Sequence, residues 1–143
     1  MFLYFFQYIF KMRLFKLLKE LRSYNKNTNI KLISKAYSYA KKVHKDKKRA
    51  SGESFIQHPL NVAYILAQHK SDDASIAAAL LHDVLEDSDK SLEDVKSLFG
   101  EEIANLVDGL TKLTTIKYEE HREIEYIRKM LIYSARDIRI III

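Results

Sequence analysis

The sequence predicts an all-α domain, and three features of its composition support this. With 143 residues the chain is long enough for one hydrophobic core and short for two. It contains only 3 glycines and 1 proline, whereas sheet-rich folds usually need more turn-forming residues. Apolar residues make up 48% and charged residues 30%, which is typical of a globular protein and excludes a disordered or fibrous chain. We therefore take the chain as helical and place its elements in order.

The N-terminal stretch MFLYFFQYIF is almost entirely apolar or aromatic. It is too short to span a bilayer, which takes about 20 residues. Its basic residues follow the apolar run, whereas those of a secretory signal precede it. Two interpretations remain: an interfacial segment lying on a membrane, or residues read in frame ahead of a true start at Met12. The second is favoured, so residues 1–12 are set apart as an N-terminal extension and residues 13–143 as the domain.

The first half of the domain contains two predicted helices. Four leucines share one face of residues 12–24 and predict a helix there. The NKNTN segment at 25–29 is rich in capping residues, which predicts a turn and then a new helix. Apolar side chains recur at helical spacing over 30–44. His44 ends this helix, where it either caps backbone carbonyls or lines a pocket.

A basic loop is expected over residues 45–57. The run KKVHKDKKR at 41–49 carries much of the net charge of +5. Such a run attracts nucleic acid, anionic lipid or a phosphorylated small molecule, or is simply a solvated surface. Within it Arg49 is suited to clamp a phosphate or to stack on a base.

A further helix is expected from Pro59, because proline is favoured at the first position of a helix. This places His58 at the cap, where a stiff backbone holds its side chain near the start of the helix.

The second half contains four predicted helices. An Asp at 72 or 73 caps a helix that continues to about 87. SLED at 91–94 is a capping-box pattern, and Gly100 ends the short helix that follows. The next helix covers about 101–113 and the last about 119–143. The last helix ends in IRIIII without a cap or polar tail, so we expect the chain to be cut within an element.

The stretch AALLHDVLEDSD interrupts an apolar helix with four polar groups. On a helix, His82 lies over Glu86 and Asp83 lies over Asp87, so all four form one patch. Burying such groups is costly unless they are paired, and buried acids beside a histidine are usually paired by a divalent cation. The alternative is a set of surface groups at a helix end.

The residue types limit which metal could bind. The chain has no cysteine, so the ligands must be His, Asp or Glu, and a reducing compartment such as the cytoplasm is expected. Mn²⁺, Fe²⁺ and Zn²⁺ are all compatible, and an oxygen-rich site favours Mn²⁺. A metal there would activate water and polarise a phosphoryl oxygen, with Glu86 or Asp87 moving protons. This predicts metal-assisted phosphate ester or anhydride hydrolysis. His69 and His121 are expected at the surface.

Three segments in order resemble one family: HKDKKRASGESFIQHPLNVAYIL, AALLHDVLEDS and FGEEIANLVDGLTKL. They resemble the hydrolase domain of the RelA/SpoT family of alarmone enzymes, within the HD phosphohydrolase superfamily. The resemblance runs from about Leu17 to the last residue. A His-Asp doublet alone is common by chance, whereas the ordered combination is specific.

The resemblance implies an all-helical HD-domain bundle that removes the 3′-pyrophosphate from guanosine tetra- and pentaphosphate with Mn²⁺, giving GDP or GTP. Carried over residue by residue, the metal ligands would be His58, His82 and Asp83. The acidic pair that handles water and protons would be Glu86 and Asp87. Arg49 would pack on the guanine, with Ser51 nearby.

The sequence departs from the family at its end. In the family the final helix continues into a stretch like Leu-Ala-Asp-Arg-Leu-His-Asn, whose Asp is a fourth metal ligand and whose Asn helps to bind substrate. This sequence stops before that stretch, and Asp137 is no replacement. We therefore expect weak or absent hydrolysis from this chain alone, unless a second chain completes the site. No synthetase half is present, so pyrophosphate transfer from ATP is not expected.

Other functions stay open. One is an HD phosphohydrolase of another nucleotide, and another is an inactive remnant that binds a nucleotide or a complementing chain. Nucleic-acid binding is supported by charge alone. The expected partners are thus a guanine nucleotide and a complementing chain or second copy, without nucleic acid or a membrane.

Overall fold

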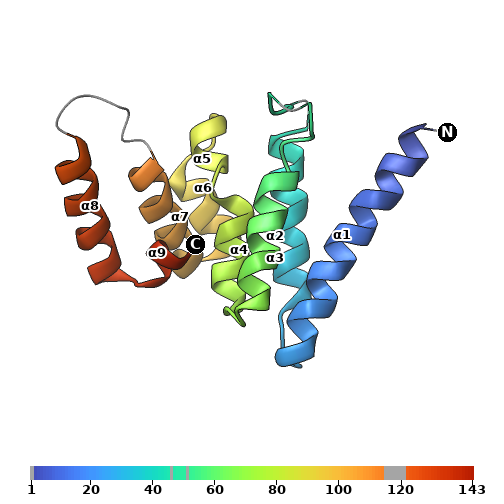
Figure 1. The fold of residues 1–143 in the computed structure, drawn as a ribbon, viewed down its shortest axis with the longest axis horizontal. Coiled ribbons are helices and arrows are strands. Elements are labelled where there is room, and N and C mark those ends of the chain that lie inside the picture. Colours follow the sequence, from blue (N-terminus) through green and yellow to red (C-terminus); the bar gives the residue numbers. More distant parts are fainter. Residues whose placement is uncertain (1, 46, 51, 115–121) are drawn as a thin grey trace.

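The computed structural model describes residues 2–45, 47–50, 52–114 and 122–143. Within these ranges the secondary structure is helical and no β-strand is present, which confirms the all-α prediction. The helices stand side by side, with α1 at one end of the molecule and α8 at the other (Figure 1). None of the helices in the described ranges is both long and apolar enough to cross a bilayer.

The N-terminal half contains α1 (Phe2–Tyr24) and α2 (Ile30–Val43). The α1 helix runs unbroken through residue 12, and the division of the chain there stays a prediction. The side chain of Asn29 caps α2 by accepting a hydrogen bond from the backbone N–H of Leu32 at 3.0 Å. The caps and the apolar spacing therefore located α2 and the end of α1 correctly, whereas α1 begins ten residues earlier than predicted, at Phe2.

The next helix, α3 (Gln57–Gln68), begins earlier than predicted. His58 is its second residue, so the prediction that His58 is the cap is wrong. The cause is a tight turn before it, in which the N–H of Gln57 donates to the carbonyl of Ser54 and that of His58 to Phe55. Pro59 is tolerated inside this first turn because the first four N–H groups of a helix have no partner within it.

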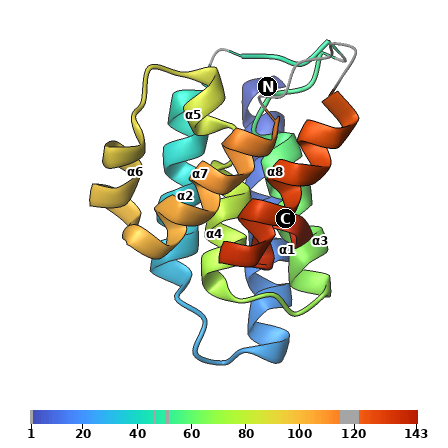
Figure 2. The same cartoon turned by 90° about the vertical axis from the view of Figure 1, so that its left-hand side faces the viewer.

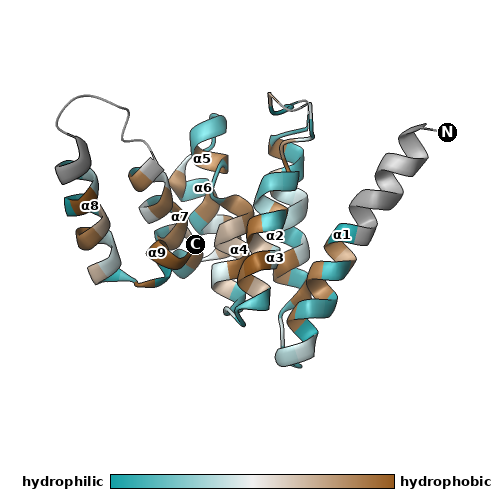
Figure 3. Ribbon diagram, viewed as in Figure 1, coloured by the Kyte–Doolittle hydropathy of each residue, from teal (hydrophilic) through white to brown (hydrophobic). Residues whose placement is uncertain are grey.

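The centre of the fold is α4 (Asp73–Leu81), which packs against α2, α3 and α7 (Figure 2). Asp72 caps it by accepting a hydrogen bond from the N–H of Ser75 at 2.7 Å. Seven consecutive residues are buried: Ser75, Ile76, Ala77, Ala78, Ala79, Leu80 and Leu81. Hydrophobic residues are concentrated on α4 and the neighbouring helices (Figure 3), and burial on all sides leaves the end of α4 fixed in place.

The helix predicted through residue 87 is interrupted at His82 and Asp83, and the prediction of one continuous helix is wrong. A short helix, α5 (Val84–Asp87), follows the interruption. Nδ1 of His82 lies 2.7 Å from the carbonyl oxygen of Ala79. In an unbroken helix that carbonyl would accept from the backbone N–H of Asp83. The histidine side chain therefore takes over a backbone acceptor where the helix breaks.

Two further helices follow α5 in the chain, and their predicted ends are confirmed. In α6 (Leu92–Phe99) the capping box of Ser91 and Asp94 is formed in both directions. Gly100 ends α6 with φ of 90°, a conformation that favours glycine. The longer α7 (Glu101–Thr114) then packs on α4 and α6.

The predicted last helix is divided into α8 (Arg122–Arg136) and α9 (Arg139–Ile142). The single helix predicted there is therefore wrong. The Asp137 carboxylate accepts hydrogen bonds from the backbone N–H of Arg139 at 3.0 Å and from its guanidinium at 2.6 Å. Such a local side-chain bond competes with continuation of the helix. The same guanidinium also reaches Asp72 and Glu102, which ties α9 to the start of α4 and to α7.

Candidate metal centre

The three predicted metal ligands lie together. His58 comes from the start of α3, and His82 and Asp83 come from the break after α4. Each offers one ligand atom, and these atoms all lie within 4.8 Å of one another. The two imidazole rings meet edge to face, with centroids 5.3 Å apart. Among the described residues no other group of three such side chains has this spacing.

The ring of His82 is held at both nitrogens. Nδ1 lies 2.7 Å from the Ala79 carbonyl, and because a carbonyl only accepts, Nδ1 carries the hydrogen. Nε2 lies 2.9 Å from Oδ1 of Asp83. Burial lowers the pKa of His82, but the hydrogen bond and charge of Asp83 outweigh this and leave the pKa raised. With Nδ1 bonded to the backbone, Nε2 is the nitrogen that could bind a metal, and an ion there would replace the hydrogen that Nε2 now shares with Asp83.

Asp83 has an unsatisfied oxygen in this cluster. Its Oδ2 atom is buried and has no hydrogen-bond partner, a state that costs free energy in a folded protein. Burial raises the pKa of Asp83, but the hydrogen bond and charge of His82, with the charge of His58, hold it below its ordinary value. The group is therefore an ionised carboxylate, with Oδ2 as the oxygen that could bind a metal ion. Two imidazoles and this carboxylate fit a divalent ion such as Mn²⁺, Fe²⁺ or Zn²⁺.

His58 is the third candidate ligand and lies half-buried. Burial lowers its pKa, the positive charges of Arg49 and His82 lower it further, and the charge of Asp83 opposes them. Its imidazole is thus kept neutral near pH 7, and the neutral form is the one that binds a metal.

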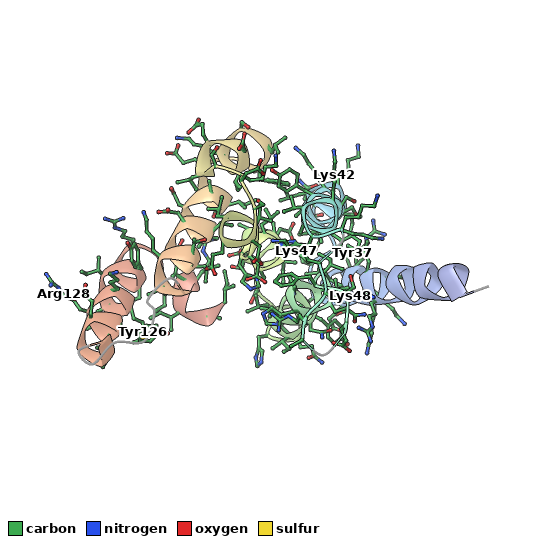
Figure 4. All side chains as sticks on the ribbon, turned by 90° about the horizontal axis from the view of Figure 1, so that it is seen from above. Tyr37, Lys42, Lys47, Lys48, Tyr126 and Arg128 are labelled. Atoms are coloured by element: carbon green, nitrogen blue, oxygen red, sulfur yellow. The ribbon has the colours of Figure 1, made fainter. Side chains whose placement is uncertain are left out.

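The predicted acidic pair lies on α5, directly after the ligands. Burial and the charges of Asp83 and Asp87 raise the pKa of Glu86, so this carboxyl group keeps a proton to higher pH than usual. Asp87 is held by Lys47, whose ammonium group donates to the Asp87 backbone carbonyl and lies 3.8 Å from Oδ1. Figure 4 shows Lys47 reaching toward this part of the molecule, whereas Lys42 points away from it.

The predicted basic loop carries Arg49 toward the cluster. Backbone hydrogen bonds join Arg49 to Glu53 and to Gly52, whose φ of 82° suits a tight turn. The guanidinium carbon of Arg49 lies 5.3 Å from the centroid of the Phe55 ring. Arg49 is exposed, and its positive charge acts on His58. Ser51 lies outside the described residues.

His44 is the site residue whose place the sequence left open. It is 2% exposed, its Nδ1 lies 2.8 Å from the carbonyl of Ala40, and its Nε2 lies 3.6 Å from Oδ2 of Asp87. The first alternative is confirmed, because Nδ1 donates to a helix carbonyl, whereas the lining of a pocket stays a prediction. The other nitrogen faces Asp87 of the predicted acidic pair. Its spacing of four from Ala40, and of eight from Ala36, on the buried face of α2 was the available signal. His69 is exposed as predicted, and His121 lies outside the described residues.

A cavity of about 300 Å³ opens beside the two histidines. Apart from the two histidines its walls are mostly apolar and come from α3, α7, α8 and α9: Val62, Leu110, Leu113, Tyr126, Met130, Ile140, Ile141 and Ile143. His58 and His82 therefore lie at the edge of a mostly apolar cavity.

Comparison with known proteins identifies the family. The HD domain family matches residues 36–143, as expected for an all-α HD bundle. A GTP pyrophosphokinase of Myxococcus xanthus is 44% identical over 125 residues, which cover 84% of this chain and 16% of that protein. The guanosine-3′,5′-bis(diphosphate) 3′-pyrophosphohydrolase of Aquifex aeolicus is 47% identical over 111 residues, 78% of this chain and 16% of that protein.

The bifunctional (p)ppGpp synthase/hydrolase SpoT of Escherichia coli is 42% identical over 135 residues, 92% of this chain and 19% of that protein. The chain thus spans less than a fifth of the length of these relatives. The matches to these three relatives cover 78–92% of this chain, and the family match covers residues 36–143. The resemblance drawn from the motifs is therefore confirmed. The chain belongs to the RelA/SpoT family of HD-domain proteins.

Proposed function

We propose that this domain hydrolyses the 3′-pyrophosphate of guanosine 3′,5′-bis(diphosphate) and its pentaphosphate analogue, giving GDP or GTP and pyrophosphate. The observation that carries the proposal is the convergence of His58, His82 and Asp83 with an unpartnered buried oxygen on Asp83. The name of the Aquifex aeolicus relative, a guanosine-3′,5′-bis(diphosphate) 3′-pyrophosphohydrolase, supports the choice of substrate.

The three converging residues would hold Mn²⁺. When bound, such an ion lowers the pKa of a water and polarises a phosphoryl oxygen. The hydroxyl of the attacking water joins phosphorus, the bond from phosphorus to the 3′ oxygen breaks, and that oxygen takes a proton. The ionised Asp83 supplies the negative charge that keeps a divalent ion in place.

Glu86 and Asp87 are proposed to handle the protons. The raised pKa of Glu86 suits it to carry a proton that it gives to the 3′ oxygen. Asp87, which Lys47 holds, would then orient the attacking water as a carboxylate. Arg49 would pack on the guanine from its exposed place over Phe55, and its charge would also attract the phosphates.

We further propose that the site takes one more metal ligand, an Asp that the resemblance places beyond these residues. A complementing chain or a second copy could also supply such a group. The reaction would take place in the cytoplasm on a free nucleotide.

The test is hydrolysis of guanosine tetraphosphate with Mn²⁺ in ¹⁸O-labelled water, comparing the chain with a version extended by the family's next helix. We expect GDP and labelled pyrophosphate, with faster release from the extended version and none from Asp83→Asn. Cleavage of other nucleotides but not of the alarmone would assign the domain to another HD phosphohydrolase. Nucleotide binding without turnover in both versions would identify an inactive remnant.

A further inference from the structure

A buried histidine outside the ligand cluster faces the acidic pair. The side chain of His44 is 0% exposed, although histidine is rarely buried so completely without a function for its ring nitrogens. Nδ1 lies 2.8 Å from the Ala40 carbonyl and therefore donates to it. The ring face stacks on Phe55 with centroids 4.7 Å apart and planes 14° apart. A hydrogen bond and a stacked neighbour together fix the ring in one orientation.

The remaining nitrogen of this fixed ring is directed at Asp87. Nε2 lies 3.6 Å from Oδ2 of Asp87 and is buried without a hydrogen-bond partner. This distance is just longer than a hydrogen bond, so a small rotation of the carboxylate closes it. On the other carboxylate oxygen, Oδ1, Lys47 lies 3.8 Å away. Asp87 is therefore held between one fixed imidazole and one flexible ammonium group.

The same stack reaches the substrate side of the site. Phe55 contacts the His44 ring and also lies under the guanidinium of Arg49, whose Cζ is 5.3 Å from the ring centroid. The partly buried Phe55 ring thus contacts both the imidazole that faces Asp87 and the arginine of the basic loop. These groups come from segments far apart in the sequence.

We propose that His44 is a positioning residue: its Nε2 sets the orientation of the Asp87 carboxylate, and its ring face supports Arg49 through Phe55. This rests on the proposed function only in that Asp87 is taken to act in hydrolysis. A histidine that merely fills space would use its ring but not Nε2. The two roles therefore separate when the nitrogen is removed and the ring volume is kept.

The first test needs no activity. In the metal-free chain with ¹⁵N-labelled histidine, Asp87→Asn should move the Nε2 resonance of His44, whereas Asp89→Asn, whose side chain is 92% exposed, should not. In the reverse direction His44→Phe should move the carboxyl ¹³C resonance of Asp87. The amide of His44→Gln reaches the position of Nε2, whereas the amide of His44→Asn replaces Nδ1. The Asp87 resonance of His44→Gln should therefore lie closer to that of the wild type than the resonance of His44→Asn.

The second test is kinetic and uses the extended protein of the previous section. His44→Phe and His44→Asn should lower kcat about tenfold with little change in KM or in Mn²⁺ affinity, and His44→Gln should restore most of the loss. Equal effects of Gln and Asn, or resonances that do not respond to the partner, would overturn the proposal. If no alarmone is cleaved at all, the proposed function fails, and the resonance measurements still decide the role of His44.

Discussion

Ile140 packs onto Gly109 so closely that a Cβ atom on that glycine would lie 2.5 Å from Cδ1 of Ile140. Gly109 lies within α7, where glycine is less favourable than alanine by about 1 kcal/mol. Ile140 is 5% exposed and belongs to α9, which also lines the cavity beside His58 and His82. The missing side chain therefore allows α9 to lie against α7 at the edge of the site.

Gly109→Ala should destabilise the protein by about 1–3 kcal/mol, because the new methyl group meets a buried side chain. The same substitution in an Ile140→Val background should cost less or stabilise, since valine lacks the Cδ1 atom and alanine favours the helix. Urea denaturation of the four proteins in this cycle measures the coupling. Additive effects of the two substitutions would contradict the close contact.

Metal binding should strengthen as the pH rises through the raised pKa of His82. Burial lowers this pKa, but the hydrogen bond and charge of Asp83 raise it above the ordinary 6.5, and the proton must leave before Nε2 binds an ion. Titration calorimetry with Mn²⁺ in two buffers of different ionisation enthalpy should show release of about one proton per ion at low pH. Release should decline above the pKa of His82. The pH range from about 5.5 to 8.5 brackets the ordinary histidine pKa by about one unit below and two above. A Mn²⁺ affinity that does not change over this range would exclude His82 as a ligand.

The metal-free protein should show the opposite trend in stability. His82 has a raised pKa, so its pairing with Asp83 stabilises fully below pH 6.5 and is lost as the pH rises through the folded value. Asp83 has a lowered pKa, so its contribution is complete above pH 3.8 and is lost as the pH falls through the folded value. The pair should therefore stabilise most between these two ordinary values. Urea denaturation of wild type and His82→Ala, from below pH 3.8 to above pH 6.5, measures the difference in their unfolding free energies. This difference should shrink below and above the range between the two values.

Asp83→Asn should lower Mn²⁺ affinity by at least about 100-fold, because it removes the charged ligand rather than a supporting group. The helical circular dichroism should be retained, since asparagine keeps the shape of the side chain. The matched control is Asp89→Asn, an acid nearby in the sequence whose side chain is 92% exposed. Equal Mn²⁺ binding by the two variants would show that the ion is held elsewhere.

The sequence located those helix ends whose signals are local, such as both ends of α2 and of α6. The capping box of Ser91 and Asp94 and the end of α6 at Gly100 follow from neighbouring residues, and both were predicted. The candidate ligands were found from motifs and family resemblance, although only the fold brings His58 beside His82.

What the sequence could not give depends on contacts between distant segments or on side-chain choices. The break at His82 arises because its ring takes the Ala79 carbonyl, which apolar spacing does not reveal. The break after α8 accompanies the bonds of Arg139 to Asp137 and to acids of two other helices. The contact of His44 with Asp87 required α2 and α5 to be placed in space.

Arg139→Gln should weaken the attachment of α9, and the loss should depend on pH. The guanidinium lies 2.6 Å from Asp137, 2.8 Å from Glu102 and 3.1 Å from Asp72. These groups are partly exposed, so solvent screening limits the cost to about 1 kcal/mol. The hydrogen bond with Arg139 is the main cause of the lowered pKa of Asp137. Burial raises the pKa of Asp72, but hydrogen bonds with Ser75 and Arg139 outweigh burial and leave that pKa lowered. A carboxyl group whose pKa is lowered by folding stabilises the folded protein fully above its ordinary pKa of 3.8. This stabilisation is lost as the pH falls through the pKa of the folded state.

The difference in unfolding free energy between wild type and Arg139→Gln should therefore be largest near neutral pH and should close in acid. Urea denaturation at a series of pH values measures it, and Arg128→Gln, which removes an exposed arginine of α8, is the matched control. Because Ile140 follows Arg139 and lines the cavity beside the two histidines, the variant should also loosen this wall. A constant difference across the pH series would mean that Arg139 acts through packing of its stem rather than through its carboxylate partners.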